Sequence, residues 1–447
     1  MKLHKDVLLS CEEAKLKRIG QDHLFERWDE LTKSQKDHLL MQIEQLDERV
    51  FHQESSPRPL SPQPLQEFFS SGSQDDQERG KRLIAEGKCA CLVLAGGMAT
   101  RLRFKGPKGC FPVSIGKNKT LFQLLAEKVK AASKAAKRPL QLAIMTSPLN
   151  HVETETYFVQ NGFFGLEPPQ VHFFFQEMWP LLDFQKRLFL QAPDQIGFGP
   201  NGNGGALRRL YRSGLWQSWK EQSIERVSLI SIDNPLADPF DAELFGFHAR
   251  REDEVTLKAV SRSEPKEKVG VVVRMEDKIA VVDYMELSPE VREAHVDGAL
   301  KYSVANIGLF CFCMDFIEKV AEKTLPIHGV KKSVKMMDKD LPKEPNVWKF
   351  EEFIFDLLPF SEKSSVLIYP RNKTFAPLKN IEGEDSIKTV QAALQAADRE
   401  VYQRISGVTP PPESQFELAQ EFYYPTEEFT ARWKGKSLPD KTYVEAL

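Results

Sequence analysis

The 447-residue chain lacks both a long apolar run and an excess of charge of either sign. A membrane-crossing helix needs roughly 18 to 20 apolar residues in a row. No such run is present, so we expect no membrane segment. The 61 basic residues nearly balance the 64 acidic ones, for a net charge of -3. This balance argues against bulk attraction to nucleic acid or to anionic membranes, but it leaves room for a small basic pocket that binds phosphates.

The chain also lacks the cysteine content of a disulfide framework. Its six cysteines include the pairs Cys89 with Cys91 and Cys311 with Cys313, and each pair lies inside an apolar run. Structural zinc sites more often separate paired cysteines by about two to four residues. We therefore expect buried, reduced thiols. Charged side chains interrupt the apolar stretch near the start of the chain, so we expect a cytoplasmic protein without a signal peptide.

No internal repeat is present, and the texture of the sequence predicts three parts. Residues 1–85 are expected to form a helical cap followed by a Pro- and Ser-rich connector. Apolar residues of this cap recur mostly at three- and four-residue steps, namely Leu24, Trp28, Leu31, Leu39, Leu40, Ile43 and Leu46. This stripe favours a self-buried helical face, with a partner surface as the alternative. Residues 86–380 are predicted to form the main domain, and residues 381–447 a small C-terminal α+β part.

Short apolar runs alternate with helix-like stretches through the main domain. The runs are CACLVLAG, LQLAIMTS, VHFFFQ, RVSLISID and SVANIGLFCF, and TLFQLLAEKVKAASKAAK is a helix-like stretch between two of them. Such alternation predicts an α/β fold with a mostly parallel, Rossmann-like sheet covered by helices on both faces. Ligands of these sheets bind at the carboxyl ends of the strands. We therefore expect the chemistry where each apolar run stops.

The strongest motif follows the first of these runs. Residues 92–102 read Leu-Val-Leu-Ala-Gly-Gly-Met-Ala-Thr-Arg-Leu, and residues 106–109 read Gly-Pro-Lys-Gly. Glycine lets backbone N–H groups approach phosphate oxygens, and Arg101 and Lys108 can neutralise a triphosphate. The alternative is a sharp strand-to-helix turn with solvated cations. The glycines alone are also weak evidence for a triphosphate site, since dinucleotide sites use similar turns. The nearby Pro-Lys-Gly makes the motif considerably more specific.

These residues resemble the signature of the UDP-sugar pyrophosphorylases, Leu-x-Gly-Gly-x-Gly-Thr-Arg-Leu-Gly followed by Pro-Lys, and above all the eukaryotic-type UDP-N-acetylhexosamine pyrophosphorylases. Further similar segments follow in the family's order over roughly residues 20 to 440. They are residues 173–176 with Pro180, 199–205, 232–234, 269–271, 284–286, 306–307 and 375–380. The resemblance implies the nucleotide-diphospho-sugar transferase (GT-A-like) form of the α/β sheet.

The resemblance also implies roles for individual residues. Arg101, Lys108 and Lys379 are expected to be catalytic. Residues expected to bind the nucleotide are Leu94, Ala95, Gly96, Gly97, Lys108, Gln176 and Gly202. Residues expected to bind the sugar phosphate are Asn203, Asp233, Gly270, Glu286, Asn306 and Lys379. Asp233 ends an apolar run, where its carboxylate can hold Mg²⁺. Taken singly, these residues are more readily a helix cap, a core-edge amide, a strand-edge amide or solvated charges.

The implied activity is that of a uridylyltransferase. The oxygen of a sugar 1-phosphate attacks the α-phosphorus of UTP in line, pyrophosphate leaves, and a UDP-sugar forms, with UDP-N-acetylglucosamine as the favoured product and UDP-glucose or UDP-galactose as alternatives. Catalysis then consists of positioning and charge neutralisation, with Mg²⁺ as the cofactor. The expected partners are UTP and the sugar 1-phosphate, without nucleic acid or membrane. We expect a monomer or a weak homo-oligomer.

Two positions depart from the family's pattern. The third glycine of the signature is Ala99, and the glycine after Thr-Arg-Leu is Arg103. A positive φ at position 99 would cost an alanine roughly 1 kcal/mol or more, and Arg103 could assist or block phosphate binding. We predict that Ala99→Gly leaves the activity similar or raises it.

Three alternatives remain open from the sequence. A sugar-transferring enzyme on a similar fold usually has Asp-x-Asp at the strand end, whereas this chain has Asp-Asn-Pro at residues 233–235. A dehydrogenase should have a full Gly-x-Gly-x-x-Gly with an acid roughly 20 residues later, and Glu127 lies too far along. A catalytically weak UDP-sugar-binding descendant is supported only by Ala99 and Arg103.

Overall fold

The computed structural model describes residues 11–52, 61–337 and 339–446. The chain divides into two compact units. Unit 1 comprises Met1–Pro59, Gln176–Gly205 and Thr324–Asp356, and unit 2 comprises Leu60–Phe175, Ala206–Lys323 and Leu357–Leu447. The division of the chain into parts at residues 85 and 380 stays a prediction.

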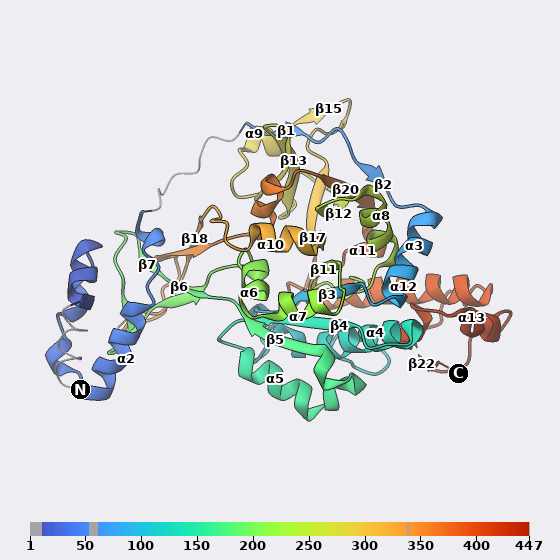
Figure 1. Ribbon diagram of the computed structural model, residues 1–447, viewed down its shortest axis with the longest axis horizontal. Coiled ribbons are helices and arrows are strands. Elements are labelled where there is room, and N and C mark those ends of the chain that lie inside the picture. The colour runs from blue at the N-terminus through green and yellow to red at the C-terminus, as the bar shows by residue number, and fades with distance from the viewer. Residues whose placement is uncertain (1–10, 53–60, 338, 447) are drawn as a thin grey trace. The chain divides into compact units, whose positions relative to one another are not determined.

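Unit 2 is built on a central sheet with the strand order β2-β20-β12-β17-β11-β3-β4-β5 (Figure 1). The bounds are β2 Phe69–Ser70, β3 Cys89–Leu94, β4 Gln141–Thr146, β5 Val171–Phe175, β11 Arg226–Ser231, β12 Val255–Ser261, β17 Val304–Cys313 and β20 Ser364–Tyr369. All neighbours pair in parallel except β17, which is antiparallel to both β11 and β12. The mostly parallel α/β sheet predicted from the sequence is confirmed, and each of the five apolar runs contains one of its strands.

The side chains of strand β3 are buried on both faces of the sheet. All six of its residues are buried. Because side chains alternate along a strand, Cys89, Cys91 and Val93 share one face, and they join a core cluster that includes residues of helix α4. The cysteines are free, and burial raises the pKa of Cys91 to about 12. The prediction of buried thiols is confirmed for this pair and for Cys311, whereas Cys313 at the end of β17 is only partly buried; their reduced state stays a prediction.

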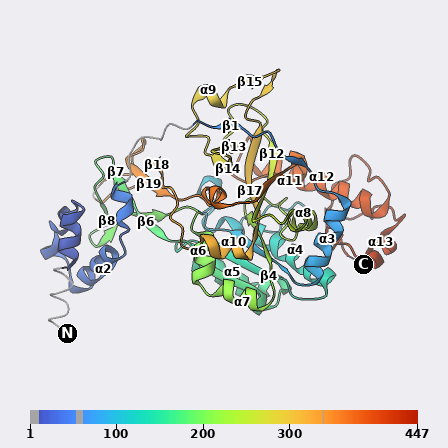
Figure 2. The ribbon, with the colours of Figure 1, turned by 45° about the horizontal axis from the view of Figure 1, so that its top comes forward.

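Helices flank this sheet (Figures 1 and 2). Their bounds are α3 Gln74–Ala85, α4 Leu121–Ala136, α5 His151–Gln160, α6 Ala206–Arg212, α7 Leu215–Glu221, α8 Ala242–Arg251 and α10 Met314–Val320. The predicted helix after Thr120 is α4, and the Thr120 hydroxyl accepts a hydrogen bond from the Gln123 N–H, which caps the helix start.

A smaller antiparallel hairpin joins the start of β17. It consists of β13 Gly270–Met275 and β14 Lys278–Val282, and Gly270 and Asn306 are directly opposite across β13 and β17. The register of β17 against β12 shifts after Asn306, because residues 307 and 308 form a bulge. Gly308 has φ +71° and permits this bend.

The C-terminal part of unit 2 has its own core. It contains α12 Ile387–Ser406, α13 Glu427–Trp433 and the parallel pair β21 Glu417–Leu418 and β22 Tyr443–Val444. Tyr402, Phe422 and Trp433 are buried together there. Short helix α11 Arg371–Thr374 leads from β20 toward the segment that carries Lys379.

Unit 1 combines helix α2 Lys33–Glu44 with short strands, among them β6 Met178–Pro180, β10 Phe198–Pro200, β18 His328–Lys332 and β19 Val347–Glu351. A capping box of Thr32 and Gln35 starts α2. Leu39 and Ile43 of the apolar stripe are fully buried in the core cluster of this unit, so the prediction of a self-buried face is confirmed. Among the described residues, no helix is both long and apolar enough for a bilayer crossing.

Candidate active site

The glycine-bearing segment after β3 forms a tight loop in unit 2. The Ala95 N–H donates to the Met145 carbonyl on the neighbouring strand at 2.7 Å, and the Lys108 N–H donates to the Gly97 carbonyl at 3.0 Å. A Cβ added to Gly97 would meet no atom closer than Lys108 Cε at 4.0 Å, and the φ of Gly97 is not positive. The fold itself therefore does not require glycine at position 97, which is consistent with space kept for a ligand.

The two departures from the signature have different consequences. Ala99 is buried with φ -89° and ψ 30°, so the left-handed strain considered for this position is absent. Arg103 instead has φ 51° and ψ 29°, in the left-handed region that favours glycine. Of these two positions, only position 103 has left-handed backbone strain. Arg103 directly follows the short helix Thr100–Leu102, and its side chain is exposed. The effect of Ala99→Gly on activity stays a prediction.

Two predicted residues from neighbouring strand ends form an ion pair. Lys108 begins a short 3-10 helix after the loop, and Asp233 follows β11. Lys108 Nζ lies 3.3 Å from Asp233 Oδ2, and each side chain is 20% exposed. The Ile232 N–H bonds to the Leu94 carbonyl at 3.1 Å, which ties the ends of β11 and β3 together. The sheet therefore places a cation and a carboxylate together at its carboxyl edge.

The segment that carries Lys379 is fastened to Asp233 through the backbone and through Asn234. The Leu378 N–H donates to the Asp233 carbonyl at 2.7 Å. Asn234 is buried, its Nδ2 donates to the Thr374 carbonyl at 2.8 Å, and its Oδ1 accepts from the Ala376 N–H at 3.1 Å. Asn234 was not predicted as a site residue, although the match at residues 232–234 contained it.

Lys379 also has a carboxylate partner. Its Nζ lies 3.7 Å from Asp385 Oδ2, and its backbone N–H donates to the Asp385 carbonyl at 2.7 Å. Burial raises the pKa of Asp385, while Lys379 and Arg371 oppose this rise. Lys108, Asp233 and Lys379, which come from three separate segments, thus belong to one connected group.

Gly270 and Asn306 lie side by side at the same edge of the sheet. A Cβ on Gly270 would lie 2.8 Å from Val281 Cγ1 and 3.7 Å from Asn306 Cβ, so close packing excludes a side chain there. Asn306 Oδ1 accepts the N–H of Gly308 at 3.0 Å, which orients the amide within the bulge. Glu286 is half-buried, and its N–H bonds to the Asp283 carbonyl at 2.9 Å.

Arg101 lies near the segment that carries Glu286. Burial and Asp283 raise the pKa of the Tyr284 hydroxyl, and the Arg101 guanidinium opposes this rise. Arg101 thus acts electrostatically on Tyr284, two residues before Glu286.

Gln176, Gly202 and Asn203 belong to unit 1. Gln176 is buried. Gly202 has φ +84°, and a Cβ there would lie 2.4 Å from the Glu352 carbonyl oxygen. Asn203 Oδ1 accepts from the Ile354 N–H at 2.9 Å. Glycine at position 202 is therefore required by the fold of unit 1 itself, and the side-chain oxygen of Asn203, which was expected to bind the sugar phosphate, has a protein partner.

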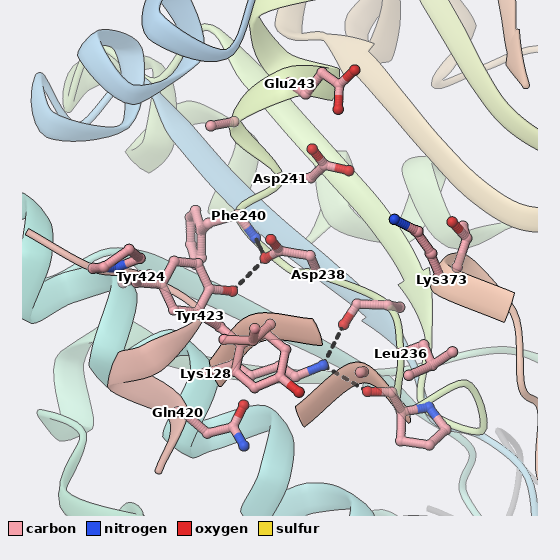
Figure 3. A pocket seen from close by; sticks show the side chains of 18 of the residues that line it. Lys128, Leu236, Asp238, Phe240, Asp241, Glu243, Lys373, Gln420, Tyr423 and Tyr424 are labelled. Atoms are coloured by element: carbon pink, nitrogen blue, oxygen red, sulfur yellow. Dashed lines mark hydrogen bonds between the residues drawn. The ribbon is translucent and has the colours of Figure 1, made fainter. Parts of the chain in front are cut away.

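A separate cavity of about 1000 Å³ lies in unit 2 between α4, α12 and the loop after Asp233. It contains none of the predicted site residues. Lys128 Nζ donates to the carbonyls of Pro235 and Ala237 at 2.6 and 2.8 Å, and burial lowers its pKa to about 8. The Tyr424 hydroxyl donates to Asp238, and burial raises the pKa of this acid (Figure 3). These buried groups hold the loop that follows Asp233.

The comparisons with known proteins agree with this sheet and these strand ends. The family model described as UTP–glucose-1-phosphate uridylyltransferase matches residues 31–435. The chain therefore belongs to this family of uridylyltransferases, the UDP-sugar pyrophosphorylases. The family resemblance and the enzyme class expected from the sequence are confirmed.

Individual relatives are similar over most of their length. A protein of Schizosaccharomyces pombe named probable UDP-N-acetylglucosamine pyrophosphorylase is 35% identical over 398 residues, which are 81% of this chain and 83% of that protein. The crystal structure of the Trypanosoma brucei UDP-N-acetylglucosamine pyrophosphorylase in complex with an inhibitor has a TM-score of 0.80 at 25% identity, covering 95% of this chain and 94% of that one. A putative UDP-N-acetylglucosamine pyrophosphorylase from Entamoeba histolytica has a TM-score of 0.78 at 28% identity, covering 85% of this chain and 98% of that one.

Proposed function

We propose that this enzyme transfers a uridylyl group from UTP to N-acetylglucosamine 1-phosphate, forming UDP-N-acetylglucosamine and pyrophosphate. The choice of sugar is supported by the names of the relatives at 25 to 35% identity. The reaction itself is supported by the group of Lys108, Asp233 and Lys379, which meets at the carboxyl edge of the sheet where ligands of such folds bind. This group is the observation that carries the proposal.

In this mechanism, a phosphate oxygen of the sugar 1-phosphate attacks the α-phosphorus of UTP in line with the leaving pyrophosphate. The P–O bond to the β-phosphate breaks as the new P–O bond forms. No general base is needed, because the attacking oxygen carries negative charge already. Arg101, Lys108 and Lys379 stabilise the charge that spreads over the phosphate oxygens and orient them for attack.

The residues present also fit Mg²⁺. Proteins usually hold this ion with one or two carboxylates and substrate phosphates. Asp233 supplies a partly exposed carboxylate at the strand end. The described residues contain no cluster of three or more potential metal ligands, so phosphates and water would complete the shell. Mg²⁺, when bound, would neutralise phosphate charge. Asp233 would hold the ion, and Lys108 would bind a phosphate oxygen.

The predicted contacts of Gly270, Glu286 and Asn306 with the sugar belong to the proposal for unit 2, and the nucleotide contacts of Gln176 and Gly202 in unit 1 stay predictions. Gln176 offers both a donor and an acceptor to one edge of the base. The pairing of Gly270 with Asn306 supports a shared sugar contact, because the missing side chain leaves the Asn306 amide uncrowded on that side.

A panel assay tests the proposal. The purified protein is mixed with UTP, Mg²⁺ and one of N-acetylglucosamine, glucose or galactose 1-phosphate, and pyrophosphate release is measured. We expect the highest kcat/KM with the N-acetylated sugar. Faster release with glucose 1-phosphate would reassign the substrate, and no release with any sugar would refute the activity.

The stereochemistry at phosphorus tests the direct displacement. With UTP that carries a chiral α-thiophosphate, one in-line step inverts the configuration of the product. Retention would reveal two displacements through a covalent intermediate and would contradict the mechanism.

A further inference from the structure

Asn150, at the start of helix α5, places its side chain away from its own helix. Asparagine at a helix start often caps the helix by accepting an N–H of the first turn, but Asn150 makes no such bond. Its Nδ2 instead donates to the carbonyls of Ala95 and Gly97 at 3.0 and 3.3 Å. Its Oδ1 accepts from Ser147, from the N–H at 2.8 Å and from the hydroxyl at 3.2 Å.

This amide is buried and fully engaged. Asn150 is 1% exposed, and both its amide hydrogens and its oxygen have protein partners. Ser147 and Asn150 follow β4, whereas the two acceptor carbonyls follow β3. The side chain therefore links the ends of two neighbouring strands, and it does so at the two carbonyls that flank Gly96.

The same loop also presents the backbone N–H groups of residues 96–98. Ala95 and Gly97 direct their carbonyls to Asn150, and the Gly97 carbonyl also accepts the Lys108 N–H. Within the described residues, the N–H groups of Gly96, Gly97 and Met98 have no hydrogen-bond acceptor. Successive backbone N–H groups of this kind form anion-binding concavities. Gly96 is partly exposed and Gly97 is exposed, so solvent or a ligand can reach this part of the loop.

We propose that Asn150 is a positioning residue of the UTP site, whose buried amide holds the Ala95 and Gly97 carbonyls so that the N–H groups of residues 96–98 receive phosphate oxygens. The inference rests on the proposed function, since it assigns this loop to the phosphates of UTP. Asn150 acts through the backbone and does not itself touch the substrate.

Isosteric replacement separates the hydrogen-bond donors from the volume of the side chain. Asn150→Asp places carboxylate oxygens against two carbonyl oxygens, which repel one another, so the loop must turn. Asn150→Ala removes both donors without adding charge. We expect the Kd for UTP with Mg²⁺ to rise at least about tenfold in the Asp variant and less in the Ala variant.

Asn161 provides a matched control at the other end of α5. Its side chain is exposed and donates to the Tyr157 carbonyl one turn earlier, at 2.8 Å. Asn161→Asp makes the same chemical change on the same helix. We expect its Kd for UTP to stay within about twofold of the wild type.

Calorimetric titration with UTP and, separately, with uridine distinguishes positioning from a purely structural role. Uridine lacks phosphates, so a displacement of the N–H groups of residues 96–98 should leave the Kd for uridine unchanged. General damage to the fold weakens both ligands. A UTP-selective loss in the Asn150 variants supports the inference, whereas an unchanged Kd for UTP or an equal loss for both ligands overturns it.

The proposed function can fail separately. A wild-type protein that binds no UTP refutes the proposed function and with it the inference, while UTP binding that is insensitive to Asn150 refutes the inference alone. Should both Asn150 variants fail to fold, the wild type decides by NMR of its asparagine side-chain amides. The Asn150 amide hydrogens should exchange slowly with solvent and shift with UTP but not with uridine, and an unshifted signal at saturating UTP overturns the inference.

Discussion

Two glycine-bearing turns of the molecule look alike in sequence, but different atoms require their glycines. In unit 1, a Cβ on Gly202 would overlap the Glu352 carbonyl at 2.4 Å, and the residue has a positive φ. In unit 2, a Cβ on Gly97 would meet nothing closer than 4.0 Å. We call the turn with Gly202 the closed turn, because backbone atoms of the chain fill the space beside this glycine. The turn with Gly97 is the open turn, because it has open space beside the unpaired N–H groups of residues 96–98. The fold itself therefore requires glycine at position 202, whereas it does not require glycine at position 97.

The largest expected effect is a loss of catalytic rate when Asp233, the ion-pair partner of Lys108, is changed. Asp233→Asn keeps the shape of the side chain but removes the charge that pairs with Lys108 and that is proposed to hold Mg²⁺. We expect kcat for UDP-sugar formation to fall about 10²- to 10³-fold. The free energy of unfolding should change by less than about 1 kcal/mol, because the ion pair is partly exposed. Steady-state kinetics and urea denaturation measure the two quantities, and a kcat within fivefold of the wild type would contradict the role of Asp233.

A substitution of Gly202 in the closed turn should lower the stability of the protein. Gly202→Ala adds left-handed strain and an overlap with backbone that cannot rotate away. We expect the free energy of unfolding of the protein to fall by about 3 kcal/mol, as measured by urea denaturation. Gly214→Ala is the control, because Gly214 also has positive φ but a Cβ there would meet no atom within 4 Å. It should cost only the strain, about 1 kcal/mol; equal losses in the two variants would show that the overlap with Glu352 is unimportant.

A glycine-to-alanine substitution in the open turn should instead weaken the binding of UTP without lowering the stability of the protein. Gly97→Ala introduces a methyl group where a phosphate is proposed to lie, while its backbone remains in an ordinary region. We expect the KM for UTP to rise about tenfold, which corresponds to about 1.4 kcal/mol. Stability should be equal or higher by up to about 1 kcal/mol. A variant with lowered stability and unchanged KM would reverse the distinction between the turns.

The smallest expected effect tests where the strain of the open turn lies. Arg103→Gly relieves the left-handed backbone but adds freedom to the unfolded chain, so we expect a net gain in stability of about 0.5 kcal/mol. Lys137→Gly is the control, since Lys137 has φ 55° at the end of α4. Both variants should gain similarly in urea denaturation, with the KM for UTP changed less than about threefold. A loss of stability specific to Arg103→Gly would show that the arginine side chain makes a stabilising contact.

The sequence alone predicted much of the sheet. Each of the five apolar runs contains a strand, because continuous burial on both faces leaves a pattern that can be read locally. The direction of β17 could not be predicted, since its composition resembles that of the parallel strands and only its pairing with β11 and β12 decides it. The bulge after Asn306 likewise depends on a long-range register.

The site was predictable where motifs are contiguous and not where contacts are distant. The loop with Lys108 was expected from the positions of glycine and charge, and the role of Asp233 from the family resemblance; the ion pair between them agrees with both expectations. Asn150 could not be found in this way, because its partners Ala95 and Gly97 lie more than 50 residues away in the sequence. A short polar pattern at a helix start is typical of capping, and only the structure reveals that this amide bonds elsewhere.

A crystal structure with UTP and Mg²⁺ bound tests the central claim most directly. The account predicts phosphate oxygens within about 3.2 Å of the Gly97 N–H nitrogen and of Lys108 Nζ, with the Lys108–Asp233 pair opened. Phosphates bound in another part of the molecule, with the N–H groups of residues 96–98 facing only water, would contradict it.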